Sequence, residues 1–481
     1  MTAPPGRARR RRLRILFASA EFAPLAQTGG LGEAVGGLAR ALAARGHEVV
    51  CALPGWRRIR ENAACPALAD AGAAVGVEAS WLAGELGGVR LLLLDAPALY
   101  DRAVLYTGGA TLDEARRFTT FSRAVAARAA AEPPDVLVAH DWHAALSICA
   151  LRTLFDFGPA RSVGTVQVVH NNAYQGRFPA AAMAETGLPR ELFHSDGLEF
   201  FGDLCLLKGG LAWAERIVAV SPRHAAELQT PAFGAGLEGL YRWRAHRLLG
   251  IANGIDAAAY DPALDPALPA RYSASYAKPK GACRAALLAR FGLTPPEPGR
   301  LLAAIGRLSE QKGWDVLAEA IPALVERGAA LVLLGDGDAE RAAQLRDAAL
   351  RFPDRVAVAI GWDEVLARQL YAGADCVLVP SRFEPCGLVQ LLAQRYGALP
   401  IAHRVGGLVD TIADGETGVL FEPLDVEALV AAVERAVALV HERGLDKLQR
   451  RLLALDGSWS RPAVEYESVL AAVAREGVGR L

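Results

Sequence analysis

One complete βαβ unit is encoded by residues 14–53, RILFASAEFAPLAQTGGLGEAVGGLARALAARGHEVVCAL. An apolar run of strand length comes first, a glycine-rich loop follows, and an alanine- and leucine-rich helical segment leads to a second apolar run. Two strands joined by a helix in this way lie parallel in one sheet. The unit therefore predicts an α/β fold.

The same alternation continues along the chain and falls into two sets of strands. The first set is predicted at Arg14–Ser19, Glu48–Leu53, Val89–Leu94, Val136–Ala139, Gly164–Val169 and Arg216–Val220. The second set is predicted at Leu301–Ile305, Ala330–Leu334, Val356–Ile360, Cys376–Val379 and Leu399–Ala402. A chain of 481 residues is too long for a single core. We therefore expect two Rossmann-like, doubly wound domains that face a central cleft, where open α/β sheets bind ligands.

Prolines interrupt residues 251–296, which we interpret as an irregular linker into the second domain. The expected domains are residues 13–250 and 251–455. The first 12 residues are expected to form a basic tail. It is not the start of a secretory signal, because Glu21 interrupts the apolar stretch that follows.

Composition excludes several classes of protein. The 52 basic and 53 acidic residues leave a net charge of -1, so no global field attracts nucleic acid or a membrane surface. The seven cysteines show no CxxC spacing, which argues against a disulfide framework or a zinc site and favours a cytoplasmic protein. No apolar run is long enough to span a bilayer.

Polar residues gather after the strands of the first domain. The loop after the first strand carries Gly29 and Gly30, whose backbone could approach an anionic or hydroxyl-rich ligand or could serve only a tight turn. His140 and Asp141 follow another strand, where Asp141 could also be only a helix N-cap. His170, in VVHNNAYQGRF, follows the next strand, and a structural role for these histidines stays open. Together they suggest one site.

Two clusters follow strands of the second domain. Arg307 and Lys312 lie in AIGRLSEQKGWD, where two cations could hold a diphosphate or form a solvated surface pair. Glu384 lies in VPSRFEPCGL on a loop that breaks at Pro385 and turns into a helix. A carboxylate there can face a developing positive sugar carbon while nearby amides face phosphate. The alternative is an acid that stabilises the helix start.

In this order the motifs resemble the bacterial glycogen and plant starch synthase family over nearly the whole chain. They are TGGLGEAVGGL, HDWHAAL, VHNNAYQG, HSDGLEFFG, LKGGLAWAERIVAVSP, NGID, GRLSEQKG, PSRFEPCGL and VGGLVDT. The resemblance implies the GT-B fold and transfer of glucose from ADP-glucose to the 4-hydroxyl of an α-1,4-glucan with retention. It implies no metal ion and no other cofactor. Residues 456–481 are expected to form a helix that packs back on the first domain.

The resemblance also implies roles for matching residues. Arg307 and Lys312 would hold the donor diphosphate, Glu384 would face the glucose ring, and His170 would contact the sugar with Asp141 close by. Tyr100 would line the cleft and Trp362 would stack on the base. The implied substrate-binding set is Gln27, Gly29, Gly30, Tyr100, Asn171, Asn253, Trp362, Cys386, Gly387, Leu388 and Gly407.

Three positions depart from the family pattern. Gln27 replaces a lysine, Glu33 an aspartate and Val405 a threonine. Gln27 matters most because glutamine donates hydrogen bonds but cannot neutralise phosphate. Two alternatives therefore stay open: a related retaining glucosyltransferase that uses UDP-glucose or a small phosphorylated acceptor, and a weakly active glucan-binding paralogue.

Overall fold

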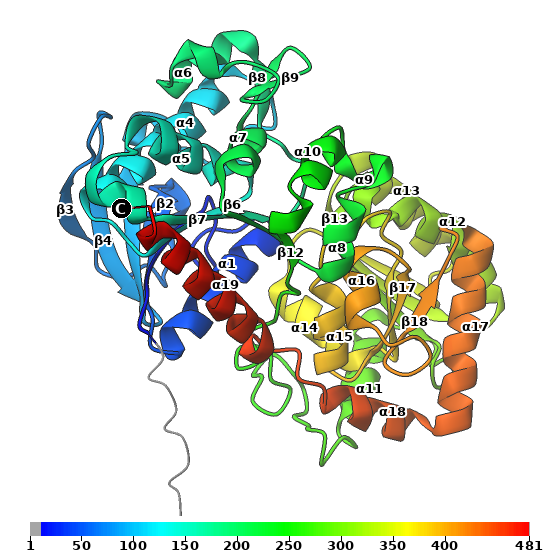
Figure 1. Ribbon diagram of the computed structural model, residues 1–481. Helices are drawn as coiled ribbons and strands as arrows, with labels where there is room; N and C mark the ends of the chain where they lie inside the picture. The colour runs from blue at the N-terminus through cyan, green and yellow to red at the C-terminus, as the bar shows by residue number, and fades with distance from the viewer. Residues whose placement is uncertain (1–10, 481) are drawn as a thin grey trace, which may run out of the picture. The chain divides into compact units, whose positions relative to one another are not determined.

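The computed structural model of the protein describes residues 11–480, so most of the predicted basic tail lies outside the described residues. The chain forms two compact units (Figure 1). Unit 1 contains the described residues up to Val220, Ala225–Ile251 and the chain from Trp459 onward. Unit 2 contains Ser221–His224 and Ala252–Ser458.

Unit 1 is built on a nine-stranded sheet in the order β12-β11-β7-β6-β1-β2-β5-β4-β3. All neighbours pair in parallel except β4, which is antiparallel to both β5 and β3. The strands are β1 (Arg14–Ala18), β2 (Glu48–Pro54), β3 (Ala69–Ala73), β4 (Ser80–Leu86), β5 (Val89–Asp95), β6 (Val136–His140), β7 (Gly164–Val169), β11 (Arg216–Ala219) and β12 (Leu248–Gly250). A small antiparallel sheet combines β8 (Arg177–Pro179), β10 (Asp203–Cys205) and β9 (Glu199–Phe200).

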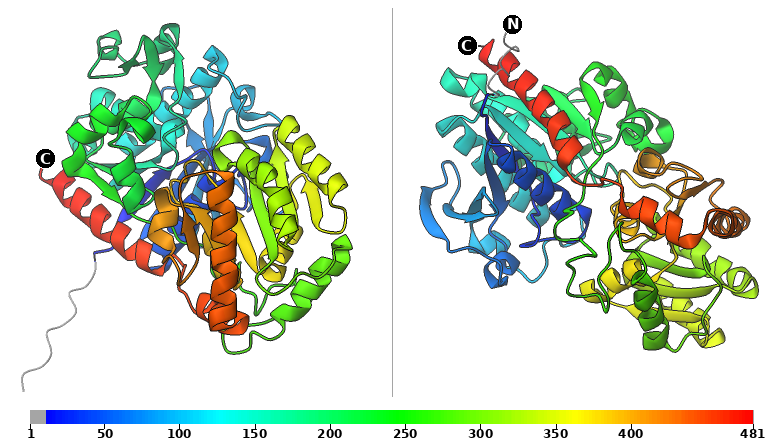
Figure 2. Two further views of the ribbon diagram at one scale, coloured as in Figure 1. Left: turned by 90° about the vertical axis from the view of Figure 1, so that its right-hand side faces the viewer. Right: turned by 90° about the horizontal axis from the view of Figure 1, so that it is seen from below.

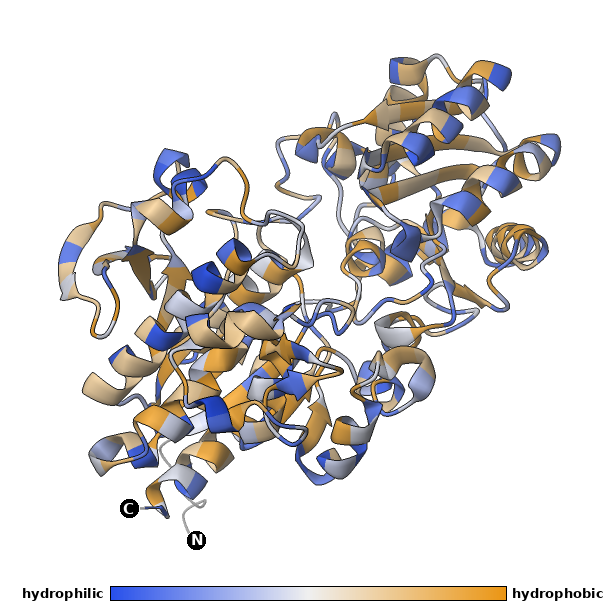
Figure 3. Ribbon diagram, turned by 90° about the horizontal axis from the view of Figure 1, so that it is seen from above, coloured by the Kyte–Doolittle hydropathy of each residue, from blue (hydrophilic) through white to orange (hydrophobic). Residues whose placement is uncertain are grey.

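Helices cover the larger sheet and bury its apolar strands, which appear orange in Figure 3. The α-helices of unit 1 are α1 (Gly30–Ala44), α2 (Arg57–Glu61), α3 (Pro97–Tyr100), α4 (Leu112–Ala131), α5 (Asp141–Leu154), α6 (Met183–Thr186), α7 (Leu206–Trp213), α9 (Pro231–Gly234), α10 (Glu238–Trp243) and α19 (Ser460–Val478). The short helix α8 (Pro222–Glu227) belongs to unit 2 up to His224 and to unit 1 from Ala225. Short 3-10 turns are η1 (Gly158–Ser162), η2 (Ala180–Ala182), η3 (Arg190–Leu192) and η4 (Ala245–Arg247).

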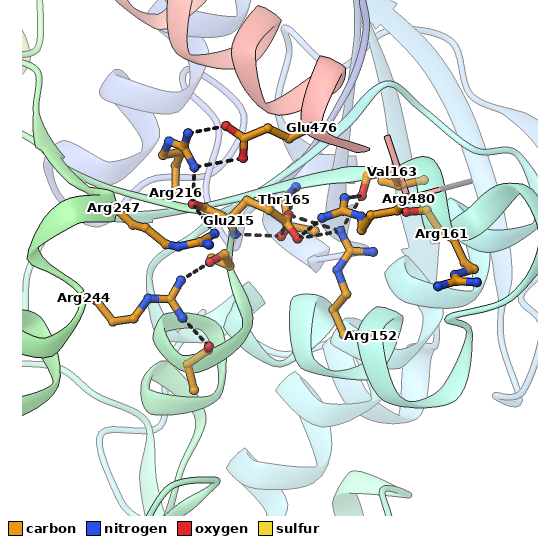
Figure 4. A network of polar contacts seen from close by, with 12 residues as sticks. Arg152, Arg161, Val163, Thr165, Glu215, Arg216, Arg244, Arg247, Glu476 and Arg480 are labelled. Carbon is orange, nitrogen blue, oxygen red and sulfur yellow. Dashed lines mark hydrogen bonds and ion pairs between the residues drawn. The ribbon is translucent and has the colours of Figure 1, made fainter. Parts of the chain in front are cut away.

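The C-terminal helix α19 is part of unit 1 and lies beside α1 (Figure 2). Its start approaches α1 so closely that a Cβ on Gly37 would lie 2.1 Å from Trp459 Nε1. At its other end, the Arg480 guanidinium binds Glu215 at 2.6 Å and Glu476 pairs with Arg216 (Figure 4). Close packing at one end and ion pairs at the other fix α19 to the rest of unit 1.

Unit 2 is built on a six-stranded parallel sheet in the order β15-β14-β13-β16-β17-β18. The strands are β13 (Leu301–Leu308), β14 (Ala330–Gly337), β15 (Val356–Ile360), β16 (Cys376–Val379), β17 (Leu399–His403) and β18 (Val419–Phe421). The helices are α11 (Lys280–Phe291), η5 (Glu310–Lys312), α12 (Trp314–Glu326), α13 (Ala339–Arg351), α14 (Glu364–Gly373), α15 (Val389–Arg395), α16 (Gly406–Thr411), α17 (Val426–Arg443) and α18 (Leu445–Leu453). Leu317, Leu333 and Val433 belong to a continuous apolar core between sheet and helices.

The predicted α/β architecture is confirmed, and every predicted strand is present within a few residues. Two expectations are wrong. The prediction of an irregular linker at residues 251–296 fails at α11, because Pro279 precedes that helix instead of breaking it. β13 runs to Leu308 instead of ending at Ile305, so Arg307 lies on the strand itself. Across residues 11–480, no helix combines the length and apolar character that crossing a bilayer demands.

Candidate functional site

The loop after β1 is organised by a buried carboxylate. Glu21 accepts hydrogen bonds from the Thr28 backbone at 2.9 Å, the Thr28 hydroxyl at 2.8 Å and the Tyr106 hydroxyl at 2.7 Å. Gln27 is half-buried beside them, and its Oε1 has no hydrogen-bond partner within the described part of the chain. The loop that carries Gln27 is therefore fixed, but the Gln27 side-chain oxygen accepts no hydrogen bond from the described residues.

The glycines of this loop differ in what the protein demands of them. A Cβ on Gly32 would lie 2.9 Å from Gln27 Cβ, so the loop packing requires glycine there. A Cβ on Gly29 would meet nothing within 4 Å, and the extended φ of -172° at Gly29 suits any residue. Gly29 and Gly30 are exposed at the start of α1. Neither the packing nor the backbone conformation of the described residues requires a glycine at position 29. The open space there leaves room for a ligand against the Gly29 backbone.

Asp141 links the ends of β6 and β7. Its backbone adopts a φ of +54°, which is uncommon outside glycine. Its Oδ1 accepts hydrogen bonds from the backbone N–H of His170 at 2.6 Å and of Asn171 at 3.2 Å. The N-cap residue of α5 is His140, and Asp141 is the first residue of the helix itself. The alternative that Asp141 is only an N-cap is therefore wrong, because the carboxylate positions the His170–Asn171 segment.

Burial raises the pKa of Asp141 to about 7, against the opposing effect of its two backbone hydrogen bonds. The folded chain therefore holds this proton more tightly than the unfolded chain, whose aspartate has the ordinary pKa of 3.8. As the pH rises from about 4 toward 7, the protein loses the stability that this bound proton contributes. Asp141→Asn cannot ionise. Its free energy of unfolding relative to the wild type should therefore rise between pH 4 and 7, by up to about 1.4 kcal/mol per pH unit. Urea unfolding of both proteins across this range measures the difference, and a pH-independent difference would contradict the assignment.

His140 and His170 form a direct contact beside Asp141. His140 Nδ1 lies 2.9 Å from His170 Nε2, so one ring donates and the other accepts. Burial lowers the pKa of His140 well below its ordinary value, which keeps that ring neutral. His143 is buried against Tyr106 and Trp142, and burial lowers its pKa to about 3. His143 is therefore a core residue, whereas His170 is half-buried.

In unit 2 the end of β13 presents the two predicted cations. Arg307 is exposed, and its side chain makes no hydrogen bond or ion pair with any described residue. Lys312 ends the short turn η5. Gly313, which follows with a φ of +66°, lets this turn approach Pro380, since a Cβ would lie 1.9 Å from the Pro380 carbonyl oxygen.

Glu384 is the centre of the unit 2 cluster. It is 6% exposed, and its Oε2 accepts from Lys312 Nζ at 2.6 Å and from the Ser381 hydroxyl at 2.9 Å. The carboxylate thus has a fixed orientation beside a fixed cation. The two loops that carry the pair are also tied through their backbones, because Arg382 N donates to Gln311 O at 2.8 Å and Gln311 Nε2 donates to Phe383 O at 3.1 Å.

The chain after Glu384 is packed against the start of α16. Gly407 N donates to Glu384 O at 2.9 Å, and a Cβ on Gly407 would lie 2.4 Å from the Cys386 backbone. Gly387 adopts a φ of +77° and turns the chain through half-buried Leu388 into α15. Cys386 is buried, and burial raises its pKa to about 12 against a backbone hydrogen bond from Asn253. The structure thus brings Asn253, Cys386 and Gly407 to the Glu384 loop.

Two predicted site residues lie apart from these clusters. Tyr100 is 0% exposed, packs against Trp56 and donates its hydroxyl to Arg117 O at 2.8 Å. The prediction that Tyr100 lines a cleft is therefore wrong, because its side chain is part of the unit 1 core. Trp362 follows β15 and is 71% exposed, so its ring is accessible, and its stacking on a base stays a prediction.

Two residues of the clusters were not predicted as site residues. Glu21 organises the Gln27 loop, and Ser381 orients Glu384. Both are polar residues that come shortly after a buried strand, and this position in the sequence could have indicated them as site residues. Among residues 11–480 no group of three or more His, Cys, Asp or Glu side chains could hold a metal ion.

Comparison with known proteins places this architecture in one family. The family profile described as starch synthase catalytic domain matches residues 14–243, and the profile of glycosyl transferases group 1 matches residues 299–438. The chain is 40% identical to a glycogen synthase of Methylocella silvestris, over 96% of this chain and 99% of that protein. It is 42% identical to a glycogen synthase of Roseobacter denitrificans, over 90% and 93%.

A solved structure shows the same fold. The catalytic domain of starch synthase IV from Arabidopsis thaliana, bound to ADP and acarbose, superposes with a TM-score of 0.87 at 29% identity. The match covers 97% of this chain and 100% of that one. The predicted GT-B type of α/β fold is thereby confirmed. The chain belongs to the glycogen and starch synthase family and is a glycosyltransferase.

Proposed function

We propose that the protein is a glycogen synthase that transfers glucose from ADP-glucose to the 4-hydroxyl at the non-reducing end of an α-1,4-glucan, with retention at the anomeric carbon. The observation that carries the proposal is the buried Glu384 carboxylate held 2.6 Å from Lys312. The 40% identity to glycogen synthases over nearly the full chain and the ADP bound to the similar starch synthase support the donor and the acceptor.

The unit 2 cluster supplies charges of both signs for the transfer. As the glycosidic bond of the donor breaks, the sugar carbon becomes positive and the diphosphate becomes more negative. Glu384 stabilises the first charge, while Lys312 and the exposed Arg307 stabilise the second. Because Ser381 and Lys312 already hold the Glu384 carboxylate in one orientation, little reorganisation is needed at the transition state.

The unit 1 cluster positions sugar hydroxyls. Asp141 fixes the backbone of His170 and Asn171, and His140 holds the His170 ring. Retention follows when the acceptor attacks on the face from which the diphosphate leaves and the leaving phosphate takes the proton. Lys312 and Arg307 supply two cations that can neutralise that diphosphate, so we propose a reaction without a metal ion. A cytoplasmic location fits a nucleotide-sugar donor.

Release of ADP tests the proposal directly. Purified protein is mixed with glycogen and either ADP-glucose or UDP-glucose, and the released nucleotide and the labelled glucan are measured. Glycogen-dependent ADP release with glucose incorporated into the glucan is expected. Release from UDP-glucose alone would favour a related glucosyltransferase, and glycogen binding with no nucleotide release would favour a glucan-binding paralogue.

Gln27→Lys tests the departure at the glycine-rich loop. A lysine would add the cation that the family carries there and would remove a buried amide oxygen without a partner in the described chain. We expect kcat/KM for ADP-glucose to rise about tenfold, the scale of one charge-assisted hydrogen bond. Gln27→Met is the matched control, since it removes the same oxygen without adding charge. Equal kinetics of Gln27→Lys and wild type would show that this position does not limit donor use.

A further inference from the structure

The hairpin between β9 and β10 carries an aromatic residue in an unusual backbone conformation. Its two turn residues, Phe201 and Gly202, have φ values of +52° and +85°. A two-residue turn with both φ values positive favours Asn or Asp followed by Gly. A bulky side chain at the first position is strained, and such strain persists where the surrounding structure or function maintains it.

Burial does not explain this choice of residue. The Phe201 side chain is 77% exposed, while neighbouring Phe200 is 6% exposed and part of the core. Phe201 packs edge-on against Phe200, with ring centroids 4.7 Å apart, and lies close to Gly236. Most of its ring surface therefore faces solvent.

The hairpin is nevertheless rigidly built. Gly202 N donates to Glu199 Oε1 at 2.6 Å, and the Arg177 guanidinium lies 5.1 Å from the centre of the Phe200 ring. Arg177 also pairs with Asp203 at 2.9 Å, and both side chains are about 40% exposed. The charged pair is thus held beside Phe200, the residue that precedes the exposed ring in the chain, and it offers hydrogen-bond donors and acceptors to a ligand.

The same surface continues to the unit 1 cluster. Asn172 Nδ2 donates to Gly234 O at 2.9 Å, and Gln175 Nε2 donates to Ala235 O at 3.1 Å. These bonds tie the loop that follows His170 to the 234–236 turn, against which Phe201 lies. Tyr174 of this loop is 53% exposed. Two segments that each carry an exposed aromatic residue therefore meet at the 234–236 turn, and one of them begins at His170 and Asn171.

We propose that Phe201 and Tyr174 form an accessory subsite for the α-glucan acceptor, in which the rings stack on glucose units and Arg177 and Asp203 bind their hydroxyls. This inference rests on the proposed function, which supplies a polymeric acceptor. One aromatic side chain buries a surface area of about 150 to 250 Å² when it is fully covered. That area suits one or two sugar rings and falls far below the roughly 800 Å² that each partner of a stable protein interface buries.

Affinity electrophoresis in gels that contain glycogen tests the subsite without requiring turnover. Phe201→Asn keeps a residue that the turn favours and removes the ring, and Tyr174→Ala removes the second ring. We expect each change to weaken the apparent affinity for glycogen about 3- to 10-fold, the scale of one stacking contact. Phe201→Asn should also melt at the same or a higher temperature than the wild type, because the strain is relieved. Phe157→Ala, at another exposed aromatic of unit 1, is the matched control and should bind glycogen as the wild type does.

The outcomes separate this inference from the proposed function. Unchanged glycogen affinity in Phe201→Asn, with normal ADP release by the wild type, overturns the subsite alone. Weakened affinity in a protein that releases no ADP supports the subsite and overturns the proposed reaction. In an active enzyme, the ratio of KM for glycogen to KM for maltotriose should rise in Phe201→Asn. Loss of self-association in this variant, with glycogen affinity intact, would identify a protein contact and overturn the proposal.

Discussion

Glu384→Gln is expected to lower kcat at least about 100-fold, the usual scale for the loss of one electrostatic partner of a transition state. Glutamine has nearly the volume of glutamate and can still accept hydrogen bonds from Lys312 and Ser381, which reach this side chain at 2.6 and 2.9 Å. The fold of the loop should therefore be preserved while the negative charge opposite the sugar carbon is lost. Glu384→Ala should lose at least as much activity.

The control for this variant is a substitution in another ion pair of unit 2, one that belongs to neither of the candidate clusters. Glu434 of α17 pairs with Arg300 at 2.9 Å, and Glu434→Gln removes a charge in the same way. We expect Glu434→Gln to retain kcat and Glu384→Gln to lose it, measured as ADP release at saturating ADP-glucose and glycogen. Circular dichroism and thermal unfolding check that both variants are folded. Near-normal turnover by Glu384→Gln would remove Glu384 from the reaction.

The parallel strands could be predicted because burial on both faces makes them continuous apolar runs. β16, CVLV, and β6, VLVAH, are buried along their whole length, and their pattern is evident without the structure. β3, ADAGA, is mostly exposed at the edge of the sheet and carries no such pattern. The antiparallel edge that β3 and β4 form was therefore not predicted.

The positions of polar residues after strands were sufficient to find candidate clusters, but not to assign contacts within them. Lys312 and Glu384 are 72 residues apart in the chain, and only the parallel pairing of β13 with β16 brings their loops together. The bond from Asp141 to the His170 backbone likewise depends on the register of β6 and β7. Tyr100 was misassigned because residue type does not reveal that its hydroxyl finds a buried backbone partner.

Lys312→Met should lower kcat at least about 100-fold, and a double-mutant cycle with Glu384→Gln separates its two effects. The single change removes a cation from the diphosphate and also leaves the Glu384 carboxylate, 8% exposed in its side chain, without its cationic partner. Leaving a buried charge unpaired costs about 3 kcal/mol of stability. The double variant has no such charge, so it should recover most of that stability while kcat stays low. Because both residues act on one transition state, the two losses in kcat should not multiply. Near-normal turnover by Lys312→Met, or fully multiplicative losses, would show that the pair does not act as a unit.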